Sequence, residues 1–153
     1  MSDSVRFEDL PGLVGREFGP GEVLVVDQER VTAFADATDD HQWIHVDAAR
    51  AADGPFGGTV AHGYLTLSLL VRLVQELGAL PTDADLIVNY GLDKLRFPAP
   101  LRTGSGIRLK ATLASLAPKG AGRYLLTLHC EVVPEDGGTP VLVADVLYLA
   151  IKG

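Results

Sequence analysis

A helix that is apolar around most of its circumference precedes four strand-like segments, and this order constrains the fold more than any other feature. Residues 63–76 place leucine and valine on most of a helical wheel, which is typical of a helix enclosed by other structure. After residue 85 the pattern changes to strands over residues 86–97, 106–116, 123–133 and 140–151, separated by short turns. Short turns between consecutive strands predict an antiparallel meander. The sequence therefore predicts an α+β fold in which an antiparallel sheet wraps around one long central helix.

Shorter elements are expected before the long helix. Residues 21–27 read as a strand, and residues 29–37 and 48–52 read as two helices. Asp27 and Asp47 stand directly before these helices, where a carboxylate can accept hydrogen bonds from free main-chain N–H groups. We expect the 153 residues to form one domain, residues 1–153.

Composition excludes several classes of function. The net charge of −7 would repel nucleic acid, and no basic stripe offsets it. The apolar run over residues 65–77 is interrupted by polar side chains and is too short to cross a bilayer. The first residues lack the basic start and apolar run of a signal peptide, so we expect a cytoplasmic, soluble protein without membrane partners. Cys130 is the only cysteine, which excludes an internal disulfide and a cysteine metal cluster.

The candidate site combines an acid, an imidazole and a glycine. Asp40 and His45 stand five residues apart, and Gly63 stands at the start of the long helix. A carboxylate and an imidazole can hold one water molecule and exchange protons with it. The main-chain N–H of Gly63, free in the first helical turn, can bind a developing oxyanion. The sequence does not decide which of the pair deprotonates the water.

A metal site is the alternative for the histidines of this segment. His41 and His45 are four residues apart, as in some zinc sites on helices. No glutamate lies between them, however, and no third ligand is evident in the sequence. We therefore expect neither a metal nor another cofactor.

These motifs resemble those of a known family. Residues 38–47, Thr-Asp-Asp-His-Gln-Trp-Ile-His-Val-Asp, resemble the hydratase-2 signature of the MaoC-like, (R)-specific enoyl-CoA hydratases. Residues 60–63, Val-Ala-His-Gly, are similar to the entry of the central helix in that family, and residues 95–104 are similar to its Arg-Phe-x-x-Pro turn. The resemblance covers residues 27–151 and implies the hotdog fold. Asp-His-Gln-Trp-Ile-His, residues 40–45, is similar to the branch of nodulation protein N.

The sequence departs from the wider family pattern at three positions. Asp39, Gln42 and Trp43 stand where the family has glycine, asparagine and proline. The departures leave the acid and the imidazole intact and fall on residues next to the expected substrate pocket.

The resemblance implies reversible hydration of trans-2-enoyl thioesters to (R)-3-hydroxyacyl thioesters, or the reverse dehydration. Asp40 and His45 would handle the water, Gly63 would supply the oxyanion N–H, and Gln42 would orient the pair. The expected contacts to a thioester of coenzyme A or an acyl carrier protein come from Trp43, Phe56, His62, Tyr64, Tyr90 and Arg96. For His62, a structural role in the turn before Gly63 is the alternative.

Two other functions remain open at this point. A hotdog thioesterase would share the fold and the helix N-terminus but would release a thiol. A noncatalytic acyl-thioester-binding module would need none of the three catalytic groups. Whichever function applies, a single hotdog leaves one edge of its sheet unpaired. This open edge predicts a homodimer.

Overall fold

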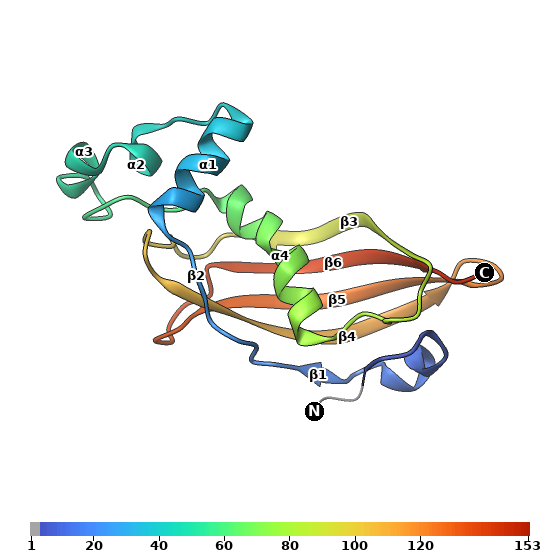
Figure 1. Ribbon diagram of the computed structural model, residues 1–153. Coiled ribbons are helices and arrows are strands. Elements are labelled where there is room, and N and C mark those ends of the chain that lie inside the picture. Colours follow the sequence, from blue (N-terminus) through green and yellow to red (C-terminus); the bar gives the residue numbers. More distant parts are fainter. Residues whose placement is uncertain (1–3) are drawn as a thin grey trace.

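The protein is built on an open antiparallel sheet of six strands (Figure 1). The computed structural model describes residues 4–153. The strand order is β1-β4-β5-β6-β3, and β2 pairs with β4 beside this path. The elements are η1, a 3-10 helix (Phe7–Leu13), β1 (Glu17–Phe18), β2 (Leu24–Val25), α1 (Gln28–Thr38), α2 (Trp43–Val46), α3 (Ala48–Ala52), α4 (Gly63–Leu77), β3 (Leu86–Arg96), β4 (Gly106–Pro118), β5 (Arg123–Pro134) and β6 (Leu142–Ile151).

The predicted meander is correct for three strands and wrong for the fourth. β4, β5 and β6 pair consecutively, whereas β3 pairs with β6 at the far edge. Residues 97–105 carry the chain from β3 across to β4, so consecutive strands are not neighbours here. The pairing of β3 with β6 shifts register between Asn89 and Gly91, where the strand is irregular.

The expected strand over residues 21–27 is reduced to β2. The flanking residues stay bonded to the β4 edge, because Gly21 N–H donates to Leu109 O and Val26 N–H donates to Ser105 O. Irregular bonds of this kind keep the segment on the sheet without a continuous ladder. Neither η1 nor the two-residue strand β1 was predicted from the sequence.

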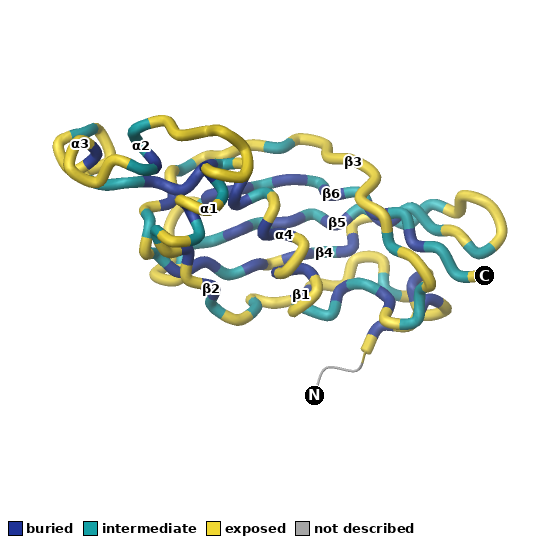
Figure 2. The backbone as a smooth tube through the Cα atoms, turned by 45° about the horizontal axis from the view of Figure 1, so that its top comes forward, coloured by how far each residue is buried: buried dark blue, intermediate teal, exposed yellow. Residues whose placement is uncertain are grey.

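α4 packs against β4 and β6, and its buried face carries Leu65, Leu69, Leu70, Leu73 and Val74. The helix ends at Gly78, which takes the left-handed conformation with φ 66°. The other side of α4 is open in the single chain, since Tyr64 is 68% exposed and Val71 is 47% exposed. The sheet therefore covers one side of the helix. Figure 2 shows that β3 is also exposed along most of its length.

No helix among residues 4–153 is both long enough and apolar enough to cross a lipid bilayer.

Cys130 supplies a test of the core. Its side chain is fully buried on β5, and burial together with the charge of Asp145 raises the pKa of its thiol to about 12. Because the thiolate is the reactive form, we expect native protein at neutral pH to resist a disulfide-exchange reagent and unfolded protein to react fully. Spectroscopic thiol titration with and without urea measures this. Rapid stoichiometric labelling of the native protein would contradict the buried placement.

Candidate active site

Three short helices carry the candidate catalytic pair beyond one end of the sheet, next to the start of α4 (Figure 1). Asp27 and Asp47 cap α1 and α3, and each carboxylate accepts a main-chain N–H, as the sequence predicted. α1 ends at Asp39, which takes the left-handed conformation with φ 60°. Asp40 follows directly, and His45 lies one turn later on α2. The chain reversal at Asp39 therefore separates the acid from the helix that carries the imidazole.

The structure brings Asp40, His45 and His62 together. One side-chain ligand atom from each residue lies within 4.8 Å of the others. The Asp40 side chain is 52% exposed, whereas His45 is 7% exposed and His62 is 3% exposed. The two rings are thus held inside the protein while the carboxylate remains open to solvent and substrate. A gap of this size admits one water molecule bonded to both Asp40 and His45.

The protonation of the His45 ring follows from its hydrogen bond. Nδ1 lies 2.6 Å from the main-chain oxygen of Val60. A carbonyl oxygen only accepts, so Nδ1 carries a proton, and whenever the ring is neutral the lone pair is on Nε2. Gln28 fixes the same turn, because its amide donates to His45 O at 2.9 Å and accepts from Thr59 Oγ1 at 2.8 Å. His45 is therefore arranged to accept a proton at Nε2.

His62 stacks on His45, with ring centroids 3.8 Å apart and an interplanar angle of 21°. Its Nε2 donates to the main-chain oxygen of Asp40 at 2.9 Å, and Asp40 Oδ2 lies 4.0 Å from the same nitrogen. The ring of Phe34 also packs on His62 at a centroid distance of 4.9 Å. His62 is therefore buried and bonded to the protein, and its expected contact with substrate stays a prediction.

Gly63 is the first residue of α4, and within residues 4–153 its N–H donates no hydrogen bond. The positive end of the helix dipole adds to the attraction of this N–H for negative charge. A β-carbon at this position would lie 3.2 Å from the ring of Phe97. Gly63, Phe56, Ala61 and Phe97 line a cavity of about 280 Å³. Gly63 is therefore accessible from this cavity, and a larger residue at its position would crowd the Phe97 ring in the cavity wall.

The remaining expected site residues are more dispersed. Gln42 is exposed and caps α2, and its main-chain N–H, rather than its amide, approaches Asp40 Oδ1 at 3.4 Å. Trp43 is on α2, and the guanidinium of Arg50 on α3 lies 4.2 Å from the centroid of its ring. The exposed Arg96 bonds its own neighbour, Leu95 O. None of these three contacts gives a direct reason for the proposed role in binding or orientation.

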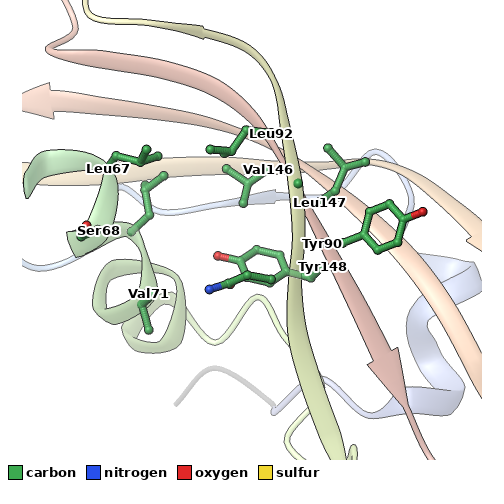
Figure 3. Close-up of a pocket in the computed structure, with 11 residues that line it drawn as sticks. Leu67, Ser68, Val71, Tyr90, Leu92, Val146, Leu147 and Tyr148 are labelled. Carbon is green, nitrogen blue, oxygen red and sulfur yellow. The ribbon is translucent and has the colours of Figure 1, made fainter. Parts of the chain in front are cut away.

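Two tyrosines lie on the exposed side of α4 and β3. Tyr64 is close to Phe97, with ring centroids 6.2 Å apart. Tyr90 borders a second cavity of about 390 Å³ between α4 and β3, together with Leu67, Val71 and Tyr148 (Figure 3). Neither Asp40 nor His45 lines this cavity. Of the expected substrate residues, Phe56 lines the cavity at Gly63 and Tyr90 lines this second one.

Sequence reasoning missed Val60, Gln28 and Phe34. Val60 contributes only a main-chain oxygen, which no side-chain pattern can mark. Gln28 contacts His45 and Thr59, which are 17 and 31 residues away. These contacts exist only after the chain has folded.

Asp40, His45 and His62 together have the side chains of a metal site. Zinc usually takes at least three protein ligands. Nε2 of His62, the atom nearest Asp40, is already occupied as the donor to Asp40 O. Nδ1 of His62 is buried and has no hydrogen-bond partner among residues 4–153, so it is the atom that His62 would offer to a metal. The expected absence of a metal stays a prediction.

Several known proteins are similar to this chain. Residues 10–122 match the family model of the MaoC like domain. The chain belongs to the MaoC-like domain family. It is 44% identical over 144 residues to 3-hydroxyacyl-thioester dehydratase Z of Mycobacterium tuberculosis, covering 93% of this chain and 95% of that protein. It is 42% identical over 140 residues to nodulation protein N of Rhizobium leguminosarum bv. viciae, covering 90% and 86%.

A solved structure of a MaoC-like dehydratase from Rhodospirillum rubrum superimposes with a TM-score of 0.79 at 25% identity, covering 98% of this chain and 99% of that chain. This similarity and the family match confirm the hotdog fold and the resemblance inferred from the motifs.

The structure explains one departure from the MaoC-like pattern. At Asp39, where the wider pattern has glycine, the backbone takes a left-handed conformation that glycine adopts freely and aspartate tolerates better than most residues. Gln42 and Trp43 occupy the start of α2, where the backbone of neither residue requires proline or asparagine. The departures are therefore compatible with the same local fold.

Proposed function

We propose that the protein is a hydro-lyase that interconverts trans-2-enoyl thioesters and (R)-3-hydroxyacyl thioesters. The observation that carries the proposal is the pairing of Asp40 with His45: one ligand atom of each side chain lies within 4.8 Å of the other, and His45 bonds Val60 O through Nδ1, which leaves Nε2 for the water. The 44% identical relative is named a 3-hydroxyacyl-thioester dehydratase, which supports the same reaction class here.

In the hydration direction, one water molecule binds between Asp40 and His45. His45 Nε2 accepts a proton from this water as its oxygen bonds to C3 of the enoyl group. The electron pair of the double bond moves toward C2 and the thioester oxygen. A proton then passes from the pair to C2, which restores the starting protonation and completes the addition of one water. Asp40 holds the water and offers a second site for the proton in transit.

We assign Gly63 to the thioester oxygen, at the end of the conjugated system opposite C3. Negative charge builds on the thioester oxygen as water adds to C3. The N–H of Gly63 has no partner among the described residues, and it lies where the α4 dipole favours negative charge. We assign it to the oxyanion. Phe56 lines the same cavity, which supports our assignment of this residue to the acyl group.

The experiment that tests this function follows the absorbance of the conjugated enoyl thioester while free thiol is measured in parallel. Short- and long-chain trans-2-enoyl groups are offered on coenzyme A and on an acyl carrier protein. A hydro-lyase removes the absorbance without releasing thiol. Thiol release would establish a thioesterase instead, and absence of turnover on every substrate would leave the binding-module function.

We further propose that the protein is a homodimer formed along β3. Edge strands with unpaired main-chain groups invite pairing with a second chain. The edge is apolar: Val88 is 40% exposed, Leu92 is 41% exposed and, beside them on α4, Val71 is 47% exposed. A second copy covering this side would bury the α4 face and close the cavity that Tyr90 borders.

A charge on this surface is expected to dissociate the dimer. Val71→Glu would place a carboxylate in the apolar interface, where its desolvation is costly. Light scattering after gel filtration should report a dimer for the wild type and a monomer for the variant. Val25→Glu is the matched control, because Val25 is 50% exposed on β2 and lies away from the β3 edge. A monomeric wild type would exclude the dimer.

A further inference from the structure

His62 has no assigned part in the proposed reaction, yet it contacts both Asp40 and His45. Its ring stacks on His45, its Nε2 bonds the main chain of Asp40, and its own carbonyl accepts the N–H groups of Leu65 and Thr66 in the first turn of α4. Gly63 is the next residue in the chain. A buried side chain with these contacts connects α1, α2 and α4 at one point.

The hydrogen bond determines the chemical state of the ring. Asp40 O only accepts, so Nε2 of His62 carries the proton. Nδ1 is buried and has no hydrogen-bond partner among residues 4–153. The ring is therefore in the Nε2–H tautomer, and it acts as a donor toward Asp40 rather than as a base.

This bond constrains the catalytic geometry. Asp40 follows the left-handed Asp39 at the exposed end of α1, and among residues 4–153 its carboxylate accepts one long hydrogen bond, 3.4 Å, from Gln42 N–H. The bond from His62 is what ties the Asp40 main chain to the interior, while stacking sets the same ring 3.8 Å from His45. Loss of the bond would free Asp40 to move relative to His45.

We infer that His62 is a positioning residue whose Nε2–H holds Asp40 at a fixed distance from His45. The inference rests on the proposed function. It does not require His62 to contact substrate or to exchange a proton with it. Because a displacement of about 1 Å in a catalytic group can lower the rate about 10²-fold, a single hydrogen bond can control most of the activity.

Two variants separate the hydrogen bond from packing. His62→Gln keeps an amide N–H at the same distance along the side chain and loses the aromatic ring. His62→Phe keeps a flat ring against His45 and Phe34 and loses the donor. His129→Gln is the control, since His129 lies on β5 and bonds Asp145 at 2.8 Å, outside the cluster.

We expect His62→Phe to lower kcat about 10²-fold with KM unchanged, because Asp40 is displaced while the binding surface stays. We expect His62→Gln and His129→Gln to keep kcat close to wild type. Thermal melting accompanies each assay. Wild-type kcat in His62→Phe would overturn the inference, as would equal losses in both His62 variants.

A spectroscopic measurement tests the inference separately from turnover. Long-range proton–nitrogen correlation of the histidine rings reports which nitrogen carries the proton. The wild type should show the proton on Nε2 of His62 and on Nδ1 of His45. A proton on Nδ1 of His62 would overturn the positioning role whether or not enoyl thioesters are substrates, whereas absence of turnover with the expected tautomers would overturn only the proposed function.

Discussion

His45→Asn is expected to lower kcat for enoyl-thioester hydration by about 10²–10⁴-fold, the usual contribution of a general acid or base. The substitution removes Nε2, the ring nitrogen that is not used in the bond from Nδ1 to Val60 O. The asparagine amide can still donate to Val60 O from a position near that of Nδ1, so the fold should be retained. Steady-state kinetics and thermal melting together measure the two effects.

Asp40→Asn is the companion variant, and it should also reduce kcat strongly because an amide cannot hold a proton in transit. The matched controls are His41→Asn and Asp36→Asn, since these two exposed residues form a pair of their own with 2.8 Å between His41 Nε2 and Asp36 Oδ1. Near wild-type turnover in His45→Asn would show that the pair is not the catalytic unit.

Gly63→Pro is expected to lower kcat about 10²–10³-fold, the cost of removing one oxyanion donor. Proline has no N–H, and the first position of a helix tolerates it because that N–H is otherwise unpaired. His62 already has the extended conformation, φ −60° and ψ 137°, that a residue before proline prefers. The variant can therefore fold with the helix intact and the donor missing.

Gly63→Ala is the control for the added side chain. It introduces the same β-carbon, 3.2 Å from the Phe97 ring, and keeps the N–H. Phe97 is 39% exposed and can move by the few tenths of an ångström required. We expect the alanine variant to retain most of its kcat. Equal losses in both variants would assign the defect to crowding at Phe97 and not to the oxyanion.

Local sequence patterns predicted the individual elements of this fold well. The caps Asp27 and Asp47, the start of α4 at Gly63 and the start of β4 at Gly106 are all placed correctly, because capping and periodicity act over a few residues. The position of β3 next to β6 was missed, since it depends on a crossing connection rather than on a turn motif. The exposed side of α4 was missed for a similar reason, because periodicity does not show which side the sheet covers.

In the candidate site, too, some features follow from local sequence and others only from the folded chain. The five-residue spacing of Asp40 and His45, read with the family resemblance, was enough to predict a catalytic pair, and the structure places the two side chains together. The tautomer of His45 and the donor role of His62 depend on the main-chain oxygens of Val60 and Asp40. Main-chain partners leave no trace in residue identity, so these roles required the structure.

The product formed from a trans-2-enoyl-CoA by the wild-type protein tests the central claim most directly. Chiral chromatography with mass spectrometry identifies both the configuration at C3 and the state of the thioester. The account predicts an intact thioester that has gained one water and carries an (R)-3-hydroxyl group. An (S) product, or free acid with released coenzyme A, would contradict it.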